Sequence, residues 1–274
     1  MINFSSVSTL PTGLPGSTFP GMLAQSSQNL TAIQHQMDVL QRNAANMSTS
    51  GFKEQLARVM PQMGGGVAIA TKLNFAQGEL SSGGINDAAI TGTGLFVTLD
   101  RFNQMIYTRA GEFSVINEDN RQFYGIRGRK AMGYRITETG ETSTLPTVID
   151  VTGYTDIGFQ DDGTIVANAT SENPIPIYQV ALAGFHNPEQ LDIIDALSYR
   201  SSPATGEPYR LAAANSPDQS LGVVSGQQRE LSNVNPASLN IEMVNLNRLL
   251  SMVQNTGFRS IDNAYKEVMK ILGT

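Results

Sequence analysis

The sequence predicts an α+β protein in which N- and C-terminal helices pair as a coiled coil, with a central mainly-β domain that is a sandwich or an open barrel. Apolar residues recur at steps of three and four near each end of the chain. Between these ends lie short runs rich in β-branched and aromatic residues, separated by Gly, Pro, Asn and Asp. We expect four parts: an extended arm at 1–20, a helix with a connecting turn at 21–66, a β domain at 67–229 and a C-terminal helix at 230–274.

The first twenty residues carry no charge and contain Pro11, Pro15 and Pro20. They lack both the basic segment and the continuous apolar segment of a secretory signal peptide. Proline and glycine at this density favour an extended arm.

The N-terminal helix is predicted from an apolar stripe among Gln, Asn, Ser and Thr. A helix of about 28 residues would be ~40 Å long. The alternating steps of three and four are typical of a coiled-coil seam. The seam residues in this helix are Leu30, Ile33, Met37, Leu40 and Ala44.

The C-terminal helix is predicted to begin with Asn235 as its N-cap and Pro236 in its first turn. Its seam residues are Leu239, Met243, Leu246, Leu250, Val253, Gly257, Ile261, Ala264, Val268 and Ile271. Either helix alone gains little from an exposed apolar stripe, so we expect the two to pair with each other and to leave apolar surface for other chains.

The β region is predicted from runs such as GLFVTL at 94–99 and IYTRAGEFSVI at 106–116. The clusters NEDN at 117–120 and DDG at 161–163 read as turns between strands. Their intervals are those expected of a sandwich or an open barrel.

Composition argues against most kinds of chemistry. The chain has no Cys, which excludes disulfides and thiolate metal sites, and its net charge of −6 favours neither nucleic acid nor an anionic membrane. No apolar run approaches the ~20 residues of a membrane-spanning helix. We therefore expect no cofactor, metal, nucleic acid, small-molecule substrate or membrane insertion, and no enzymatic activity.

Three short patterns resemble catalytic or ligand-binding motifs, but each has a simpler structural interpretation. Gly92-Thr93-Gly94 lacks the Lys-Ser/Thr of a phosphate loop and is followed by a strand, so it is predicted to be a turn. Ser50 and Lys53 fit S-x-x-K, but the accompanying elements of a serine nucleophile are missing. The DDG cluster lacks the closing Glu of a calcium loop and is read as a hairpin turn.

Basic residues are concentrated in one stretch: five of the eighteen fall at 121–135, with aromatic residues between them. RNA-binding sheets have a similar pattern, but an acidic chain favours a basic hairpin that faces acidic neighbours. The five are Arg121, Arg127, Arg129, Lys130 and Arg135. The two histidines, His35 and His186, are too few and too far apart to suggest a metal site.

Four segments, in order, resemble the signatures of bacterial flagellar rod and hook proteins. These are RNAANMSTSGFK at 42–53, GELSSGGINDAAITGTGLFVTL at 78–99, YTRAGEFSV at 107–115 and LSNVNPASLNIEMVNL at 231–246. We call the following set the motif residues: Asn43, Asn46, Thr49, Gly51, Phe52, Lys53, Gly92, Gly94, Phe96, Tyr107, Thr108, Arg109, Gly111, Phe113, Ser232, Asn233 and Val234.

The resemblance implies a structural subunit of the basal-body rod that polymerises into the axial drive shaft and transmits torque. It implies paired terminal helices in an inner tube, a β domain outside, and a turn around Gly51 and Phe52 that leads from one layer to the other. Its partners would be copies of itself, other rod or hook subunits and the flagellar type III export apparatus. Its location would be the periplasmic rod, reached without a cleaved signal peptide. The alternatives are a hook subunit or, in another class, a secreted β-domain adhesin with a helical stalk.

Overall fold

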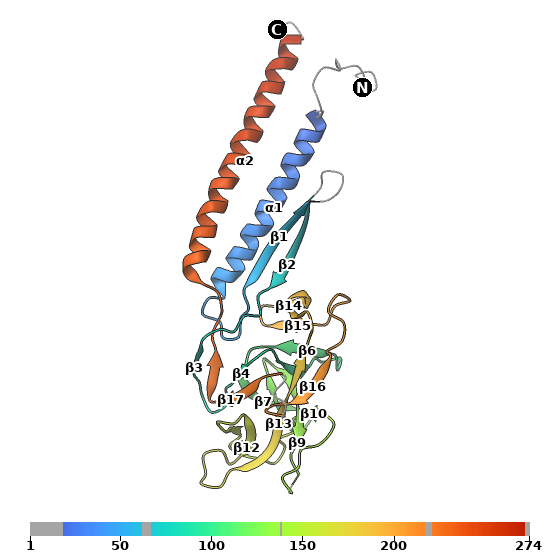
Figure 1. The fold of residues 1–274 in the computed structure, drawn as a ribbon, viewed down its shortest axis with the longest axis vertical. Helices are drawn as coiled ribbons and strands as arrows, with labels where there is room; N and C mark the ends of the chain where they lie inside the picture. Colours follow the sequence, from blue (N-terminus) through green and yellow to red (C-terminus); the bar gives the residue numbers. More distant parts are fainter. Residues whose placement is uncertain (1–18, 62–66, 138, 217–220, 272–274) are drawn as a thin grey trace. The chain divides into compact units, whose positions relative to one another are not determined.

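The computed structural model describes residues 19–61, 67–137, 139–216 and 221–271 of the chain (Figure 1). The chain forms two compact units, which we describe separately. The helical unit comprises the described parts of Met1–Asp38, Arg58–Ala70 and Glu242–Thr274. The β unit comprises Val39–Ala57 and Thr71–Ile241.

Both predicted helices are present. Helix α1 spans Phe19–Ala45 and helix α2 spans Pro236–Ile271. Asn235 caps α2 as predicted, because its Oδ1 accepts hydrogen bonds from the backbone N–H groups of Ala237 at 2.9 Å and Ser238 at 3.3 Å. Within the described residues, no helix has an apolar stretch that could span a membrane. The pairing of α1 and α2 as a coiled coil stays a prediction, as do the four domain boundaries. Residues 1–18 of the predicted arm lie outside the described part.

A two-stranded hairpin follows α1, and its first strand lies where a connecting turn was predicted. Strand β1 spans Gln55–Pro61 and pairs with β2, which spans Val67–Leu73. Residues 55–61 contain Arg, Gln and Pro among the apolar residues and lack the β-branched runs that mark the later strands.

The main sheet of the β unit has 12 strands and forms a half-barrel, which confirms the mainly-β prediction. Its principal order is β11-β12-β13-β9-β5-β6-β15-β14. The bounds along this path are β11 Gly158–Phe159, β12 Thr164–Ala167, β13 Ile175–Gly184, β9 Arg129–Arg135, β5 Leu95–Leu99, β6 Met105–Thr108, β15 Ser198–Arg200 and β14 Asp192–Asp195. Four strands join it from the side: β7 Phe113–Glu118, β8 Arg121–Ile126, β10 Thr147–Val148 and β16 Arg210–Ala213. A short 3-10 helix, η1, spans Pro188–Gln190.

Two further antiparallel pairs complete the β unit. Strand β3 (Leu80–Ser82) pairs with β18 (Gln228–Glu230), and β4 (Ala88–Thr91) pairs with β17 (Val223–Gly226). Chain segments from the beginning and the end of the β unit are therefore hydrogen-bonded to each other.

Strand β5 is buried on both faces. Leu95 and Val97 belong to a core cluster that also contains Tyr107 and Tyr199. Phe96 points the other way and packs edge-to-face on Phe113, with 5.4 Å between ring centroids. A central strand buried on both faces reads as a continuous apolar run, and LFVTL is such a run.

Candidate functional site

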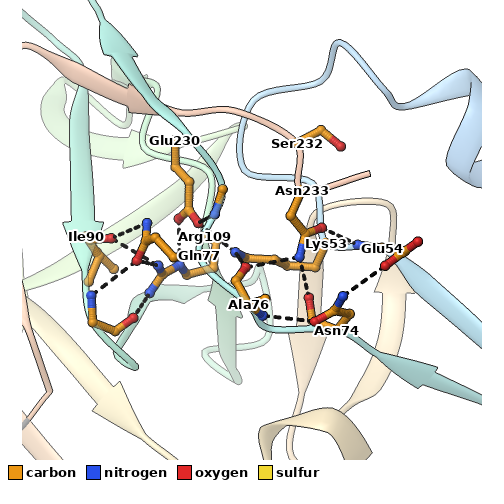
Figure 2. A network of polar contacts seen from close by, with 12 residues as sticks. Lys53, Glu54, Asn74, Ala76, Gln77, Ile90, Arg109, Glu230, Ser232 and Asn233 are labelled. Atoms are coloured by element: carbon orange, nitrogen blue, oxygen red, sulfur yellow. Dashed lines mark hydrogen bonds and ion pairs between the residues drawn. The ribbon is translucent and has the colours of Figure 1, made fainter. Parts of the chain in front are cut away.

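Four segments that are far apart in the sequence meet in one polar cluster of the β unit, which has a buried charged centre and which we call the junction (Figure 2). Two of them are the connectors of the β unit to the helices: residues 51–55, which follow α1, and residues 230–235, which precede α2. The others are the segment after β2 and the end of β6. The junction residues are Lys53, Glu54, Asn74, Gln77, Arg109, Glu230 and Asn233.

The centre of the junction holds one anion between two cations. Glu230 Oε1 lies 2.6 Å from Lys53 Nζ, and Glu230 Oε2 lies 2.8 Å from Arg109 Nε. The exposed fractions of the three side chains are 0% for Glu230, 0% for Lys53 and 2% for Arg109. When all three are ionised, one positive charge is buried in excess, which is costly unless hydrogen bonds compensate it.

Burial lowers the pKa of Lys53 below its usual range; Glu230 opposes this shift, and Arg109 adds to it. Lys53 Nζ also donates to the carbonyl of Ala76 at 2.7 Å. The ammonium is thus held by one carboxylate and one carbonyl, without contact with bulk water.

Backbone carbonyls of the turn between β4 and β5 accept hydrogen bonds from Arg109 and so compensate its positive charge. Its terminal nitrogens donate to the carbonyls of Ile90 at 3.0 Å, Gly92 at 2.9 Å and Gly94 at 2.6 Å, and to Gln77 Oε1 at 3.0 Å. Gly92 has a φ of 134°, which favours glycine. The GTG segment is therefore a turn, as predicted, and its carbonyls face a guanidinium rather than a phosphate.

Two asparagine side chains each make two hydrogen bonds to the backbone, one as donor and one as acceptor. Asn43 Nδ2 donates to the carbonyl of Gln55 at 2.8 Å, and Asn43 Oδ1 accepts from the N–H of Gln55 at 2.9 Å. Asn233 Oδ1 accepts from the N–H of Glu54 at 2.7 Å, and its Nδ2 donates to the carbonyl of Asn74 at 2.7 Å. Only an amide offers a donor and an acceptor together at this length, which explains Asn at both positions.

Gly51 lets the two connectors touch. It has a φ of 73°, and its N–H donates to the carbonyl of Glu230 at 2.7 Å. A Cβ at this position would lie 2.6 Å from Ala110 Cα. Phe52, which is fully buried, anchors the same turn, and Thr49 donates to Asn46 Oδ1 at 3.2 Å.

The remaining motif residues line the strands beside the junction. The carbonyl of Gly111 accepts from the N–H of Ala88 at 2.9 Å, and Thr108 Oγ1 accepts from the N–H of Ala110 at 3.0 Å. Ser232 Oγ accepts from the N–H of Val234 at 3.3 Å. Phe96, Tyr107, Phe113 and Val234 are buried.

Sequence reasoning missed Glu230, Gln77 and Asn74, because none of them belongs to a quoted motif. The signal for Glu230 was present: an acidic residue stands two positions before the SNV segment, in a chain whose motifs include Lys53 and Arg109.

The seam residues are distributed over both units. In the helical unit Ile33 and Leu246 are buried, and Leu30, Met37, Met243, Leu250 and Val253 are partly buried. In the β unit Leu40 and Leu239 are buried, and Ala44 is partly buried. The side-chain surroundings of Gly257, Ile261, Ala264, Val268 and Ile271 lie outside the described part.

The basic stretch forms ion pairs, as expected of a basic hairpin that faces acidic neighbours. Arg129 lies 2.9 Å from Asp195, and Arg121 and Lys130 pair with Asp150 and Glu118. Arg127 and Arg135 are exposed.

The other candidate patterns are also structural. The DDG cluster is the turn between β11 and β12, where the N–H of Gly163 donates to the carbonyl of Gln160 at 2.9 Å. His186 stacks on Tyr209, with 4.4 Å between ring centroids. Among the described residues, no group of three His, Asp or Glu side chains could hold a metal ion.

Ionisation of Tyr107 should make the β unit less stable at alkaline pH. Burial raises its pKa to about 12, and Glu207 adds to the rise. An unfolded tyrosine ionises near pH ~10, so the folded chain loses stability, on the order of 2 kcal/mol, as the pH rises from about 10 to about 12. We expect Tyr107→Phe to make this loss smaller in urea unfolding measured at several pH values; burial also raises the pKa of Tyr124 and Tyr199, so part of the loss should remain. Tyr209→Phe, at an exposed site, should leave the slope unchanged; an equal effect of both variants would contradict the assignment to burial.

Comparison with known proteins gave several similar chains. A flagellar basal-body rod protein, FlgG, of Borreliella burgdorferi is 25% identical over 247 residues, which cover 80% of this chain and 86% of the relative. FlgG of Buchnera aphidicola is 26% identical over 81% of this chain and 89% of its own length. The flagellar hook protein FlgE of Salmonella typhimurium is 29% identical, but over 43% of this chain and 31% of its own length. No protein-family model matches the chain.

Proposed function

Because this chain belongs to the family of bacterial flagellar rod and hook proteins, we propose that it is a structural subunit of the flagellar basal-body rod. The rod relatives match about four fifths of the chain and most of their own length. The hook relative matches less than half of the chain and less than a third of itself, so it supports a hook function less well.

The junction is the observation that supports a mechanical role. The two connectors are bound to each other directly, through Gly51 to Glu230, Lys53 to Glu230 and Glu54 to Asn233. Any torsion that reaches the β unit through one connector therefore acts on both. A rod must resist torsion, and a joint with a buried, hydrogen-bonded centre resists it better than two independent linkers.

We further propose that α1 and α2 pair through the seam residues and that copies of the subunit polymerise with one another and with other rod or hook subunits. The proposed location is the periplasmic rod, reached through the flagellar type III exporter without a cleaved signal peptide. The three charged side chains at the centre of the junction, Lys53, Arg109 and Glu230, are closed to solvent. All five N–H groups of Arg109 are used within the junction, which supports a structural rather than a catalytic role.

Imaging of purified hook–basal bodies from cells that express a tagged chain tests this function. Label on the rod is expected; label along the curved external hook would favour the hook alternative and contradict the rod assignment. In the same cells Leu250→Asp should abolish incorporation and motility, because a carboxylate in the seam would be buried without a partner. Asn247→Asp adds the same charge at an exposed position of α2 and serves as the matched control. Normal motility of the Leu250→Asp strain would refute the role of the seam.

A further inference from the structure

The last strands of the β unit lie in residues 221–234, a segment that we call the strap. It contains β17 and β18, and it is the orange chain beside β3 in Figure 1. Strand β17 pairs with β4 and β18 pairs with β3, and each pair is a separate two-stranded sheet. Within the part of the chain that the structure describes, β3 and β4 therefore have no strand partner other than the strap.

The main sheet, in contrast, contains no part of the strap. None of its 12 strands comes from residues 221–234. Several of its pairings join strands that are neighbours in the chain: β5 with β6, β7 with β8, β8 with β9 and β12 with β13. Pairing between chain neighbours closes short loops, which costs less chain entropy than joining distant segments. The main sheet can therefore form before the strap is in place.

The strap supplies the counter-charges of three buried side chains that precede it. Glu230 pairs with Lys53 and Arg109, and Arg229 Nε lies 2.7 Å from Asp87 Oδ2. Among the described residues, Lys53, Arg109 and Asp87 have no other ion-pair partner. A buried charge without a partner is costly, so we expect these three side chains to stay in water until the strap is in place.

Two glycines let the strap approach the backbone of earlier segments. A Cβ on Gly78, before β3, would lie 2.1 Å from the carbonyl oxygen of Leu231 in the strap. A Cβ on Gly226, in the strap, would lie 2.0 Å from the carbonyl oxygen of Gln160, after β11. Contacts at this distance form only when both earlier segments are already in position.

We propose that the strap closes last and that its closure completes the β unit. In the open state the main sheet is formed, whereas β3, β4 and the junction lack their partners. Lys53 and Glu230 are 177 residues apart, and Asp87 and Arg229 are 142 apart, so these contacts close the longest loops of the unit at the highest entropic cost. Because synthesis begins at the N-terminus, the β unit stays open until the strap has been made.

The use of this open state in export rests on the proposed function. An open β unit has fewer buried ion pairs and strand pairings to break than a closed one. It therefore opposes unfolding less, which favours transit of the chain through an exporter.

Pulsed hydrogen exchange during refolding of the purified full-length chain from urea tests the order of closure. The backbone amides of β5, β9 and β13 report on the main sheet. Those of Gly83, Gly94 and Leu231 report on the strap, because each hydrogen bond joins the strap to an earlier segment. The main-sheet amides should gain protection first, and the strap amides about tenfold later or more. Protection of both sets in one phase, or of the strap set first, would overturn the proposal.

Native-state hydrogen exchange of Glu230→Gln tests whether the buried charges hold the strap closed. The strap amides should exchange at least about a hundredfold faster than in the wild type, whereas the amides of β5 and β13 should stay within about threefold. Glu118→Gln is the matched control, since it makes the same change at a half-exposed ion pair with Lys130. It should leave both sets of amides unchanged.

Equal acceleration of both sets in Glu230→Gln would show that the strap does not open separately, and no acceleration of the strap set would show that Glu230 does not hold it; either result would overturn the proposal. The refolding order of the wild-type chain needs no variant and decides the matter even if Glu230→Gln does not fold. Both measurements use the purified chain, so their failure leaves the rod assignment intact. Conversely, a tagged chain absent from the rod would refute the function and leave the order of closure intact.

Discussion

Glu230→Gln is expected to lower the free energy of unfolding of the β unit by about 3–5 kcal/mol. The substitution keeps the shape of the side chain but leaves Lys53 and Arg109 buried at 0% and 2% exposure without a counter-charge. Glu230 accepts hydrogen bonds at both carboxylate oxygens: Oε1 from Lys53 and from the N–H of Gly78, and Oε2 from Arg109. A glutamine amide has only one oxygen, so it cannot accept at both positions. Urea unfolding followed by tyrosine fluorescence would measure the loss, because seven of the eight tyrosines belong to the β unit.

Lys53→Met is the matched comparison, since it leaves Arg109 and Glu230 as a balanced pair. Removing the surplus cation also removes the cost of its burial, which the lowered pKa of Lys53 reflects. We expect a loss of less than about half of that caused by Glu230→Gln. If Lys53→Met proves as destabilising as Glu230→Gln, charge balance does not govern the junction.

Gly111→Ala is expected to destabilise the β unit by about 4 kcal/mol or more, at the upper end of single substitutions. A Cβ on Gly111 would lie 1.6 Å from the carbonyl oxygen of Ala88, and that atom belongs to the backbone of a buried strand. The strand cannot move without breaking the hydrogen bond of 2.9 Å between the N–H of Ala88 and the carbonyl of Gly111. Thermal unfolding should show a large decrease in the midpoint, or no folded β unit at all.

Gly140→Ala separates this clash from backbone strain. Gly140 has a φ of 81°, but a Cβ there would meet no atom within 4 Å. Its substitution should cost only the strain of the left-handed conformation, about 1–2 kcal/mol. Comparable losses at the two glycines would contradict the argument that contact with Ala88 selects glycine at 111.

The helices and the fold class follow from local sequence patterns. The spacing of apolar residues and the Asn235-Pro236 cap placed α2 correctly, because a helix is built from hydrogen bonds between residues four apart. The mainly-β centre followed from β-branched runs and turn residues in the same way. Strand β1 was missed because its composition lacks that signal and it is stabilised by its pairing with β2.

The motif segments were also visible in the sequence, but the reason for them was not. Lys53 and Glu230 are 177 residues apart, and Arg109 and Glu230 are 121 apart, so no local pattern joins them. Their role depends on burial. Exposed to water, the three charges would contribute little to stability, whereas buried they bind both connectors to each other. Local patterns along the chain were enough to predict the helices, the β class and the resemblance to flagellar rod and hook proteins. That Glu230 binds both motif cations became visible in the folded chain alone, because it depends on which residues folding removes from water.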